Sequence, residues 1–340
     1  MSKIKVAVIG CGSIAKYRHI PEYAAREDVQ LIAFCDLVKE RADGYASKYQ
    51  AKAYTDYEEL LREEKPDVVS VCLPNYLHAS VTIAAAKAGA HVLCEKPMAT
   101  TDEEAFAMIT AAKENNVLLM IGHNQRFMAP HQKAKEILAR GYLGKVISFR
   151  TTFGHPGPEG WSIDGRNSWF FEKEQAVLGA MGDLGVHKTD LMRYLLDDEI
   201  VEVGAFVETL AKEDTTIDDN AVCLVKTAKG AVGTLTASWS YKKEDNSTVL
   251  YCEHGVMRLA DDPTYQVIVH LQDGSVEQYQ VGAVSTNEKQ VASGVIDEFI
   301  DSIQAGRTPS IPGEEGQKSL AVVLAMMESA ATHTFVKVKS

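Results

Sequence analysis

The amino-acid sequence predicts an α/β protein in two parts: a doubly wound parallel sheet, then an α+β domain with a large open, mostly antiparallel sheet. In residues 1–123, short apolar runs alternate with segments of helical periodicity, which is typical of a parallel sheet covered on both faces. In residues 124–340, most apolar runs show two-fold alternation and are joined by hairpin-like turns.

The composition supports two globular domains. With 340 residues, 46% apolar and 24% charged, the chain is long enough for two cores. Its net charge of −12 argues against a nucleic-acid or anionic-membrane partner. No apolar run approaches the roughly 20 residues needed to span a bilayer, and no signal-peptide pattern is present. The six cysteines lack C-x-x-C spacing. We therefore expect buried thiols and a cytoplasmic protein.

The first domain is expected to contain six strands separated by helices. The strands are predicted at 4–9, 30–35, 51–54, 67–73, 90–94 and 117–121. Helical periodicity is clearest at 79–87 and 103–114. The change of pattern after Gly122 places the domain boundary at residue 123.

The second domain is expected to begin with a helix at 130–140, a strand at 145–153 and, after an irregular stretch, a helix at 183–196. Further strands are predicted at 200–210, 220–227, 231–240, 247–252, 255–259, 265–270 and 275–281. Two helices, 289–304 and 315–332, close the chain, and their return to the first domain is left open.

A glycine turn directly after the first strand predicts a dinucleotide-binding site. Gly10 allows a tight turn, Gly12 lets the backbone approach a pyrophosphate, and Ala15 allows the next helix to pack closely on its strand. The helix that starts near Ser13 and Ile14 directs unpaired N–H groups at the anion.

Asp36 ends the second predicted strand, about twenty residues beyond the turn. A carboxylate there accepts hydrogen bonds from an adenosine ribose and repels a 2′-phosphate, so the sequence favours NAD over NADP. Arg41, which could reach a phosphate, is the observation that opposes this preference.

Two more motifs follow the fourth and fifth strands, whose carboxyl ends border the cofactor crevice. Lys96 precedes Pro97, which restricts it to an extended conformation and gives its ammonium group a defined direction. His78 is either a cofactor contact or a polar residue in the first turn of a helix. The residues expected near the cofactor here are Leu73, Pro74, Asn75, His78, Glu95 and Lys96.

Asp183 and His187 are four residues apart, so on a helix they share a face, where a carboxylate can orient an imidazole. Oxidation of a carbinol needs a base for the hydroxyl proton, and histidine suits this role near neutral pH. The alternative makes Asp183 a helix N-cap and His187 a histidine of the core.

These motifs, in this order, resemble the glucose–fructose oxidoreductase and inositol dehydrogenase family (Gfo/Idh/MocA), and the resemblance covers the whole chain. It implies an N-terminal Rossmann domain that carries NAD(P) and a C-terminal domain for substrate binding and, commonly, oligomerisation. It further implies that Lys96 and His187 flank the reacting hydroxyl and that Asp183 holds the substrate or the imidazole. It also points to His123 and Trp169 near the nicotinamide.

The stretch from His155 to Phe171 departs from a plain family pattern. Its aromatic and polar side chains suit a sugar or cyclitol ring, and we expect substrate contacts from His155, Trp161 and Arg166. The alternative is a structural loop whose tryptophans fill a gap between domains. No group of side chains has the spacing of a metal site. The acid pairs Glu63-Glu64, Asp197-Asp198 and Asp218-Asp219 are expected at the surface or in turns.

The sequence therefore predicts an NAD-dependent oxidoreductase that acts on a secondary hydroxyl of a sugar, sugar derivative or cyclitol. It leaves open whether Lys96 or His187 is the principal proton acceptor. Two alternatives are an enzyme that cleaves glycosides through transient oxidation and a non-catalytic NAD-binding sensor. Because an open sheet leaves one face uncovered, we expect a homodimer or homotetramer.

Overall fold

The computed structural model describes residues 3–282 and 292–339, and these divide into two compact units. The first unit consists of residues 3–123, 161–169 and 292–317. The second consists of 124–160, 170–282 and 318–339. Substrate binding and oligomerisation by residues 124–340 stay predictions.

The first unit contains a six-stranded sheet in the order β3-β2-β1-β4-β5-β6, in which all neighbours pair in parallel. The four residues of β4 are all buried, as expected for a strand with helices over both faces. The strands are β1 (Ile4–Ile9), β2 (Val29–Cys35), β3 (Lys52–Tyr54), β4 (Val68–Val71), β5 (His91–Cys94) and β6 (Leu119–Ile121).

The helices between these strands begin where the sequence supplies a cap. The side chain of Asp56 accepts hydrogen bonds from two backbone N–H groups of α3, and Thr101 accepts one from α5. The predicted helix 289–304 is observed as α9, and residues 289–291 lie outside the described residues. The helices of this unit are α1 (Ile20–Ala24), α2 (Lys39–Tyr49), α3 (Tyr57–Glu64), α4 (His78–Lys87), α5 (Asp102–Glu114) and α9 (Val295–Ala305).

The second unit contains a nine-stranded sheet in the order β14-β13-β12-β11-β7-β10-β9-β8-β15, with only β7 and β10 parallel among the described pairs. The predicted fold class is confirmed. The two-residue strand β15 was not anticipated. The strands are β7 (Val146–Gly154), β8 (Ile200–Glu208), β9 (Asn220–Thr227), β10 (Val232–Ser238), β11 (Thr248–Cys252), β12 (Gly255–Leu259), β13 (Val267–Leu271), β14 (Val276–Tyr279) and β15 (Val336–Lys337).

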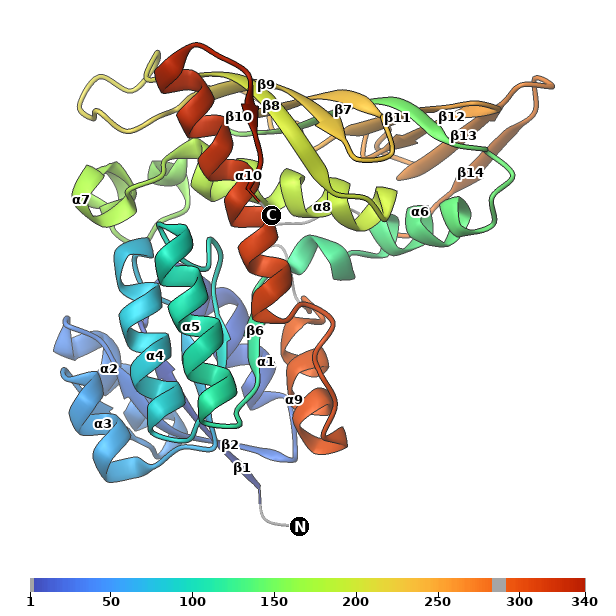
Figure 1. The fold of residues 1–340 in the computed structure, drawn as a ribbon. Helices are drawn as coiled ribbons and strands as arrows, with labels where there is room; N and C mark the ends of the chain where they lie inside the picture. The colour runs from blue at the N-terminus through green and yellow to red at the C-terminus, as the bar shows by residue number, and fades with distance from the viewer. Residues whose placement is uncertain (1–2, 283–291, 340) are drawn as a thin grey trace. The chain divides into compact units, whose positions relative to one another are not determined.

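Helices cover one face of this sheet. Figure 1 shows α6 (Ala129–Ala139) and α8 (Val186–Leu196) along that face. Residues of β9 alternate strictly between buried and more exposed positions, as expected when only one face is covered. The remaining helices are α7 (Lys173–Ala176) and α10 (Gly313–Thr332), which continues from the first unit into the second.

Short helical turns complete the structure, and two of them are π-helical. They are η1 (Ala15–His19), η2 (Asn75–Leu77), η3 (Asn124–Phe127), η4 (Pro158–Gly160), η5 (Gly165–Asn167), η6 (Trp169–Phe171) and η7 (Met181–Gly185). Among the described residues, we find no helix with the length and apolar character that a membrane crossing requires.

Candidate active site

The glycine turn after β1 has the features that a dinucleotide requires. Gly10 has a φ of +94°, and a Cβ there would lie 2.2 Å from the carbonyl oxygen of Cys72, so the backbone itself demands glycine. Gly12 differs, because a Cβ at this position would meet no atom within 4 Å. Packing of the protein therefore does not explain Gly12, whereas the open space beside it fits the approach of a diphosphate. Ile14 precedes the π-helical turn η1.

Asp36 lies at the end of β2, beside the same turn. Its two carboxylate oxygens accept hydrogen bonds from the backbone N–H groups of Cys11 and Val38, both at 2.8 Å. These bonds fix the orientation of the carboxylate and leave each oxygen with a further lone pair. The geometry is compatible with acceptance of ribose hydroxyl groups.

Glu95 is the centre of a buried polar cluster at the end of β5. His19 Nε2 lies 2.8 Å from Glu95 Oε1, and the Arg18 guanidinium lies 3.5 Å from the same oxygen. His19 Nδ1 is 2.7 Å from Ser70 Oγ, which is also 3.2 Å from the Tyr23 hydroxyl. Burial raises the pKa of Glu95, but the hydrogen bond with His19 and the charge of Arg18 outweigh burial and lower it to about 2. The side chain is therefore held as a carboxylate.

Lys96 follows Glu95 directly, and its backbone is fixed from two sides. The Lys96 N–H donates to Glu95 Oε2 at 3.2 Å. His78 binds the next part of the loop, with Nδ1 2.7 Å from the carbonyl oxygen of Pro97 and Nε2 2.8 Å from that of Leu73. The loops after β4 and β5 are thus joined through one imidazole ring, and burial lowers the pKa of His78. A cofactor contact by His78 stays a prediction.

Other predicted cofactor residues lie at the carboxyl ends of neighbouring strands. Pro74 and Asn75 follow β4, and Asn75 begins η2 and is buried. His123 follows β6 and is also buried, with its backbone N–H bonded to the carbonyl of Ile121. The sheet therefore brings the loops of β1, β4, β5 and β6 to one edge, as parallel strands require.

The irregular stretch 155–171 is divided between the two units. Residues 161–169, which we name the strap, belong to the first unit together with the glycine turn. Ser13 Oγ accepts a hydrogen bond from the Ile163 N–H at 2.9 Å and donates to the Trp161 carbonyl at 3.4 Å. Asp164 in the strap forms an ion pair with Arg41 of α2 at 2.5 Å. The strap also carries the exposed Arg166 and the half-buried Trp169.

In the second unit, Asp183 lies in the π-helical turn η7, directly before α8. It is 6% exposed, and its Oδ2 accepts a hydrogen bond from Trp239 Nε1 at 3.1 Å. Trp239 packs edge-on against Phe170 and Phe171, with ring centroids 6.1 and 6.0 Å away. Asp183 lies inside η7, whose N-cap is Ala180, and the N-cap of α8 is Gly185, so the N-cap alternative is wrong. No sequence pattern pointed to Trp239, because it lies 56 residues from Asp183 along the chain.

His187 occupies the first turn of α8 and is 8% exposed. The ring of Phe153, at the end of β7, lies 5.9 Å from the His187 ring and equally far from the ring of His155. The predicted residues Asp183, His187 and His155 are thus placed on aromatic supports in the second unit. This combination suits the apolar faces and hydroxyl groups of a carbohydrate ring.

Asp218 and Asp219 are both buried, so the prediction that this pair is solvated at the surface or in a turn is wrong. Asp218 is 8% exposed and accepts the N–H groups of Gly179 and Met181, and burial raises its pKa. Asp219 is fully buried and accepts three backbone N–H groups from residues 210–212. Asp218 bonds backbone 37 and 39 residues away, and Asp219 bonds the backbone of the preceding loop, so composition alone could not reveal their burial. Asp218 fixes the start of the turn that carries Asp183.

Lys188, next to His187, is completely buried and was not anticipated by sequence. Its Nζ donates to the carbonyl oxygen of Asn246 at 2.9 Å and lies 3.4 Å from Thr248 Oγ1. Burial lowers its pKa to about 7, and the charge of Asp245 opposes the shift. Among the described residues, no three His, Cys, Asp or Glu side chains form a group that could hold a metal ion.

Two family descriptions match most of the chain. Residues 4–123 match "Oxidoreductase family, NAD-binding Rossmann fold", and residues 131–258 match "GFO/IDH/MocA C-terminal domain".

Curated relatives include the D-glucoside 3-dehydrogenase of Escherichia coli K12, with 36% identity over 57% of this chain and 54% of the relative. The myo-inositol 2-dehydrogenase of Thermotoga maritima is 27% identical over 99% of both chains. Among solved structures, a levoglucosan dehydrogenase in complex with NADH is 26% identical over 100% of both chains, with a TM-score of 0.87. An aldose-aldose oxidoreductase from Caulobacter crescentus, complexed with glycerol, is 27% identical over 98% of this chain and 99% of that one, with a TM-score of 0.85.

Proposed function

Because the chain belongs to the GFO/IDH/MocA oxidoreductase family, we propose that it transfers a hydride between a sugar, sugar derivative or cyclitol and NAD. The reacting group is a secondary hydroxyl. The observation that carries this proposal is a full-length likeness to sugar and cyclitol dehydrogenases in a chain whose glycine turn leaves space for a dinucleotide. NADP is the less favoured cofactor, since Asp36 presents a fixed carboxylate at the end of β2.

The proposed cofactor site follows the loops of the parallel sheet. Gly12 and the N-terminus of η1 hold the diphosphate, and Asp36 holds the adenosine ribose. Bound NAD supplies the hydride acceptor, and the protein fixes its position. The proposed contact residues are Gly10, Gly12, Ser13, Ile14, Asp36, Leu73, Pro74, Asn75, His78, Glu95, Lys96, His123 and Trp169.

Lys96 and His187 are proposed to control the hydroxyl proton of the substrate. The Glu95 carboxylate fixes the backbone of Lys96, and Phe153 supports the ring of His187. Asp183, held by Trp239, then orients either the imidazole or a substrate hydroxyl. Such a base would take the hydroxyl proton of the substrate as the hydride leaves the carbon.

Aromatic rings are proposed to define the substrate class. Trp161 of the strap and the rings around His155 offer flat apolar faces, on which the C–H face of a sugar or cyclitol can stack. The polar groups of Arg166, Asp183 and His187 supply hydrogen bonds to hydroxyl groups.

A screen of cyclitols, aldoses and glycosides with NAD, read as NADH absorbance, tests the function. We expect NADH formation with at least one carbohydrate. Cleavage of a glycoside without net NADH would favour the redox-assisted cleaving enzyme instead. NAD binding without turnover of any member would favour the sensor.

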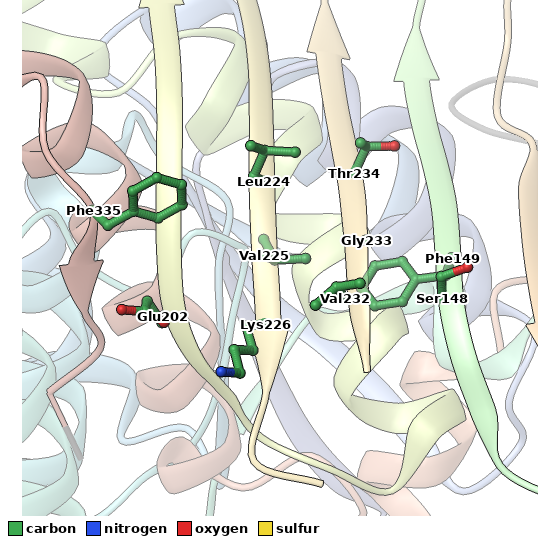
Figure 2. Close-up of a pocket in the computed structure, with 10 residues that line it drawn as sticks. All are labelled: Ser148, Phe149, Glu202, Leu224, Val225, Lys226, Val232, Gly233, Thr234 and Phe335. Carbon is green, nitrogen blue, oxygen red and sulfur yellow. The ribbon is translucent and has the colours of Figure 1, made fainter. Parts of the chain in front are cut away.

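We also propose that the protein is a homodimer or homotetramer. Its subunits would meet through the outer face of the nine-stranded sheet, which is the face opposite α6 and α8. Val222, Leu224 and Phe335 are 54%, 52% and 65% exposed there. A hollow of about 430 Å³ lies on this sheet. Figure 2 shows residues that line it, among them Leu224 and Phe335. An exposed apolar surface of this kind favours burial against a second copy. Light scattering on the wild type and on Leu224→Glu tests it, and a monomeric wild type would contradict it.

The cytoplasm is the proposed location. All six cysteines are buried and form no disulfide, which suits a reducing compartment. Fractionation of the native cells would test this.

A further inference from the structure

The cofactor preference of the protein involves two opposing charges next to the glycine turn. Asp36 repels a 2′-phosphate, whereas Arg41, five residues later on α2, is the type of residue that attracts one. Asp36 is fixed by two backbone N–H groups. Whether Arg41 can attract a 2′-phosphate depends on what its guanidinium already binds.

The strap provides a partner for Arg41. Arg41 NH2 lies 2.5 Å from Asp164 Oδ1, and the two side chains are only 28% and 33% exposed. Asp164 is held in place, because Ser13 bonds the backbone on either side of Ser162. The ion pair therefore joins α2 to a segment that is already fastened to the glycine turn.

The charge of Arg41 acts on the glycine turn, where a nucleotide would bind. The pKa of the Cys11 thiol in the glycine turn is raised by burial and by Asp36, and Arg41 acts in the opposite direction. With Asp164 paired to Arg41, the local sum of Asp36, Asp164 and Arg41 is one negative charge. The other nearby cation on α2, Lys39, is exposed and paired with Asp43.

We propose that Asp164 is a specificity-determining residue, which excludes NADP by occupying the guanidinium that would bind its 2′-phosphate. Arginine binds carboxylate and phosphate through the same forked N–H groups, so the two ligands compete. Asp36 and Asp164 thus act together against NADP. Asp36 repels its 2′-phosphate, and Asp164 occupies the Arg41 guanidinium that would otherwise bind this phosphate. This inference rests on NAD binding by the first unit and not on the identity of the sugar.

The test measures nucleotide binding without any substrate. The dissociation constants of NAD and NADP are determined by isothermal titration calorimetry for the wild type and for Asp164→Asn. We expect Asp164→Asn to tighten NADP binding about tenfold, the scale of one charge-assisted contact, and to change NAD binding less than threefold. Circular dichroism and thermal melting confirm that the variant is folded.

Two further variants separate the proposed cause from a general change of charge. Asp43→Asn removes the same charge from the exposed pair on the same helix and is expected to change NADP binding less than twofold. Arg41→Met added to Asp164→Asn is expected to abolish the gain.

An equal gain from Asp43→Asn, or a gain that survives Arg41→Met, would overturn the role of Asp164. So would unchanged NADP binding in Asp164→Asn. In these cases NAD binding by the wild type would leave the proposed function intact. A wild type that binds neither nucleotide would overturn both.

Discussion

The two units bury an ionisable group in opposite ways. In the first unit, Glu95 is bonded to His19 and paired with Arg18, whose charge compensates that of the carboxylate. In the second unit, Lys188 is bound by a carbonyl oxygen and lies beside a hydroxyl group. The pKa of Glu95 is consequently lowered to about 2, and that of Lys188 is lowered by burial to about 7.

The difference teaches how the proposed site residues of each unit are supported within that unit. The carboxylate beneath Lys96 keeps its charge at any pH near neutrality, so the β5 loop has a constant support. The helix that carries His187 instead contains a cation whose charge changes near neutral pH. We therefore expect the support of Lys96 in the first unit to be insensitive to pH near neutrality, and the stability of α8 in the second unit to depend on pH.

The largest expected effect comes from removal of either residue that we propose for proton transfer, Lys96 or His187. Lys96→Ala and His187→Ala should each lower kcat about 10²- to 10⁴-fold, because each removes a positioned acid or base. NAD binding should survive, since Gly12 and Asp36 are untouched. Steady-state kinetics and calorimetry measure the two quantities. Near-normal turnover by folded His187→Ala would leave Lys96 as the proton acceptor.

Glu95→Gln is expected to lower the free energy of unfolding by about 3 kcal/mol, because it leaves the buried Arg18 without its counter-charge. The stabilisation by Glu95 is complete above the unfolded pKa near 4.5 and is lost as the pH falls through about 2. Urea titrations at pH 7 and pH 3 measure it, and the loss should be smaller at pH 3. Glu114→Gln, at an exposed position of α5, is the control. Equal effects of the two variants would contradict the buried ion pair.

Lys188→Met is expected to change the pH dependence of stability. The folded pKa of about 7 lies below the unfolded value near 10.5, so the unfolded chain binds more protons between these values. Burial of Lys188 therefore costs stability at low pH, and this cost falls as the pH rises across that window. Met removes the cost. Relative to wild type, the variant should be about 3.5 kcal/mol more stable at pH 7 than at pH 10. A pH-independent difference, as expected for exposed Lys87→Met, would contradict this.

The smallest expected effect is that of Trp239→Phe, which removes one N–H donor and keeps an aromatic ring. We expect kcat/KM to fall about fivefold, on the scale of one hydrogen bond of about 1 kcal/mol. The NAD dissociation constant should not change, which calorimetry checks. A drop in thermal stability with normal kinetics would mean that Asp183 and Trp239 serve only packing.

Much of the fold could be predicted from local sequence patterns. The six parallel strands, the glycine turn and Asp36 all follow from periodicity and from the backbone freedom of glycine, which are local properties. The strand bounds in the second unit were predicted within a few residues for the same reason.

The parts that sequence did not predict depend on distant contacts. Ser13 meets the strap across 148 residues, and Arg41 meets Asp164 across 123. No local pattern distinguishes Asp219, which satisfies buried backbone N–H groups, from an acid in a solvated turn. The π-helical turn η7, which directly precedes α8, was also missed. Asp183 and His187 have the same sequence spacing in an ordinary helix, so the sequence could not distinguish the two.

The strap also means that the first unit is not a continuous piece of the gene. The chain leaves this unit after residue 123, returns for residues 161–169 and returns again for 292–317 among the described residues. Residue Glu22 bonds Ser293, so the last return is part of its packing. A recombination or truncation that takes residues 1–123 alone would lose these parts. We therefore expect the function of the protein to change more readily through point substitutions in its loops than through exchange of whole domains.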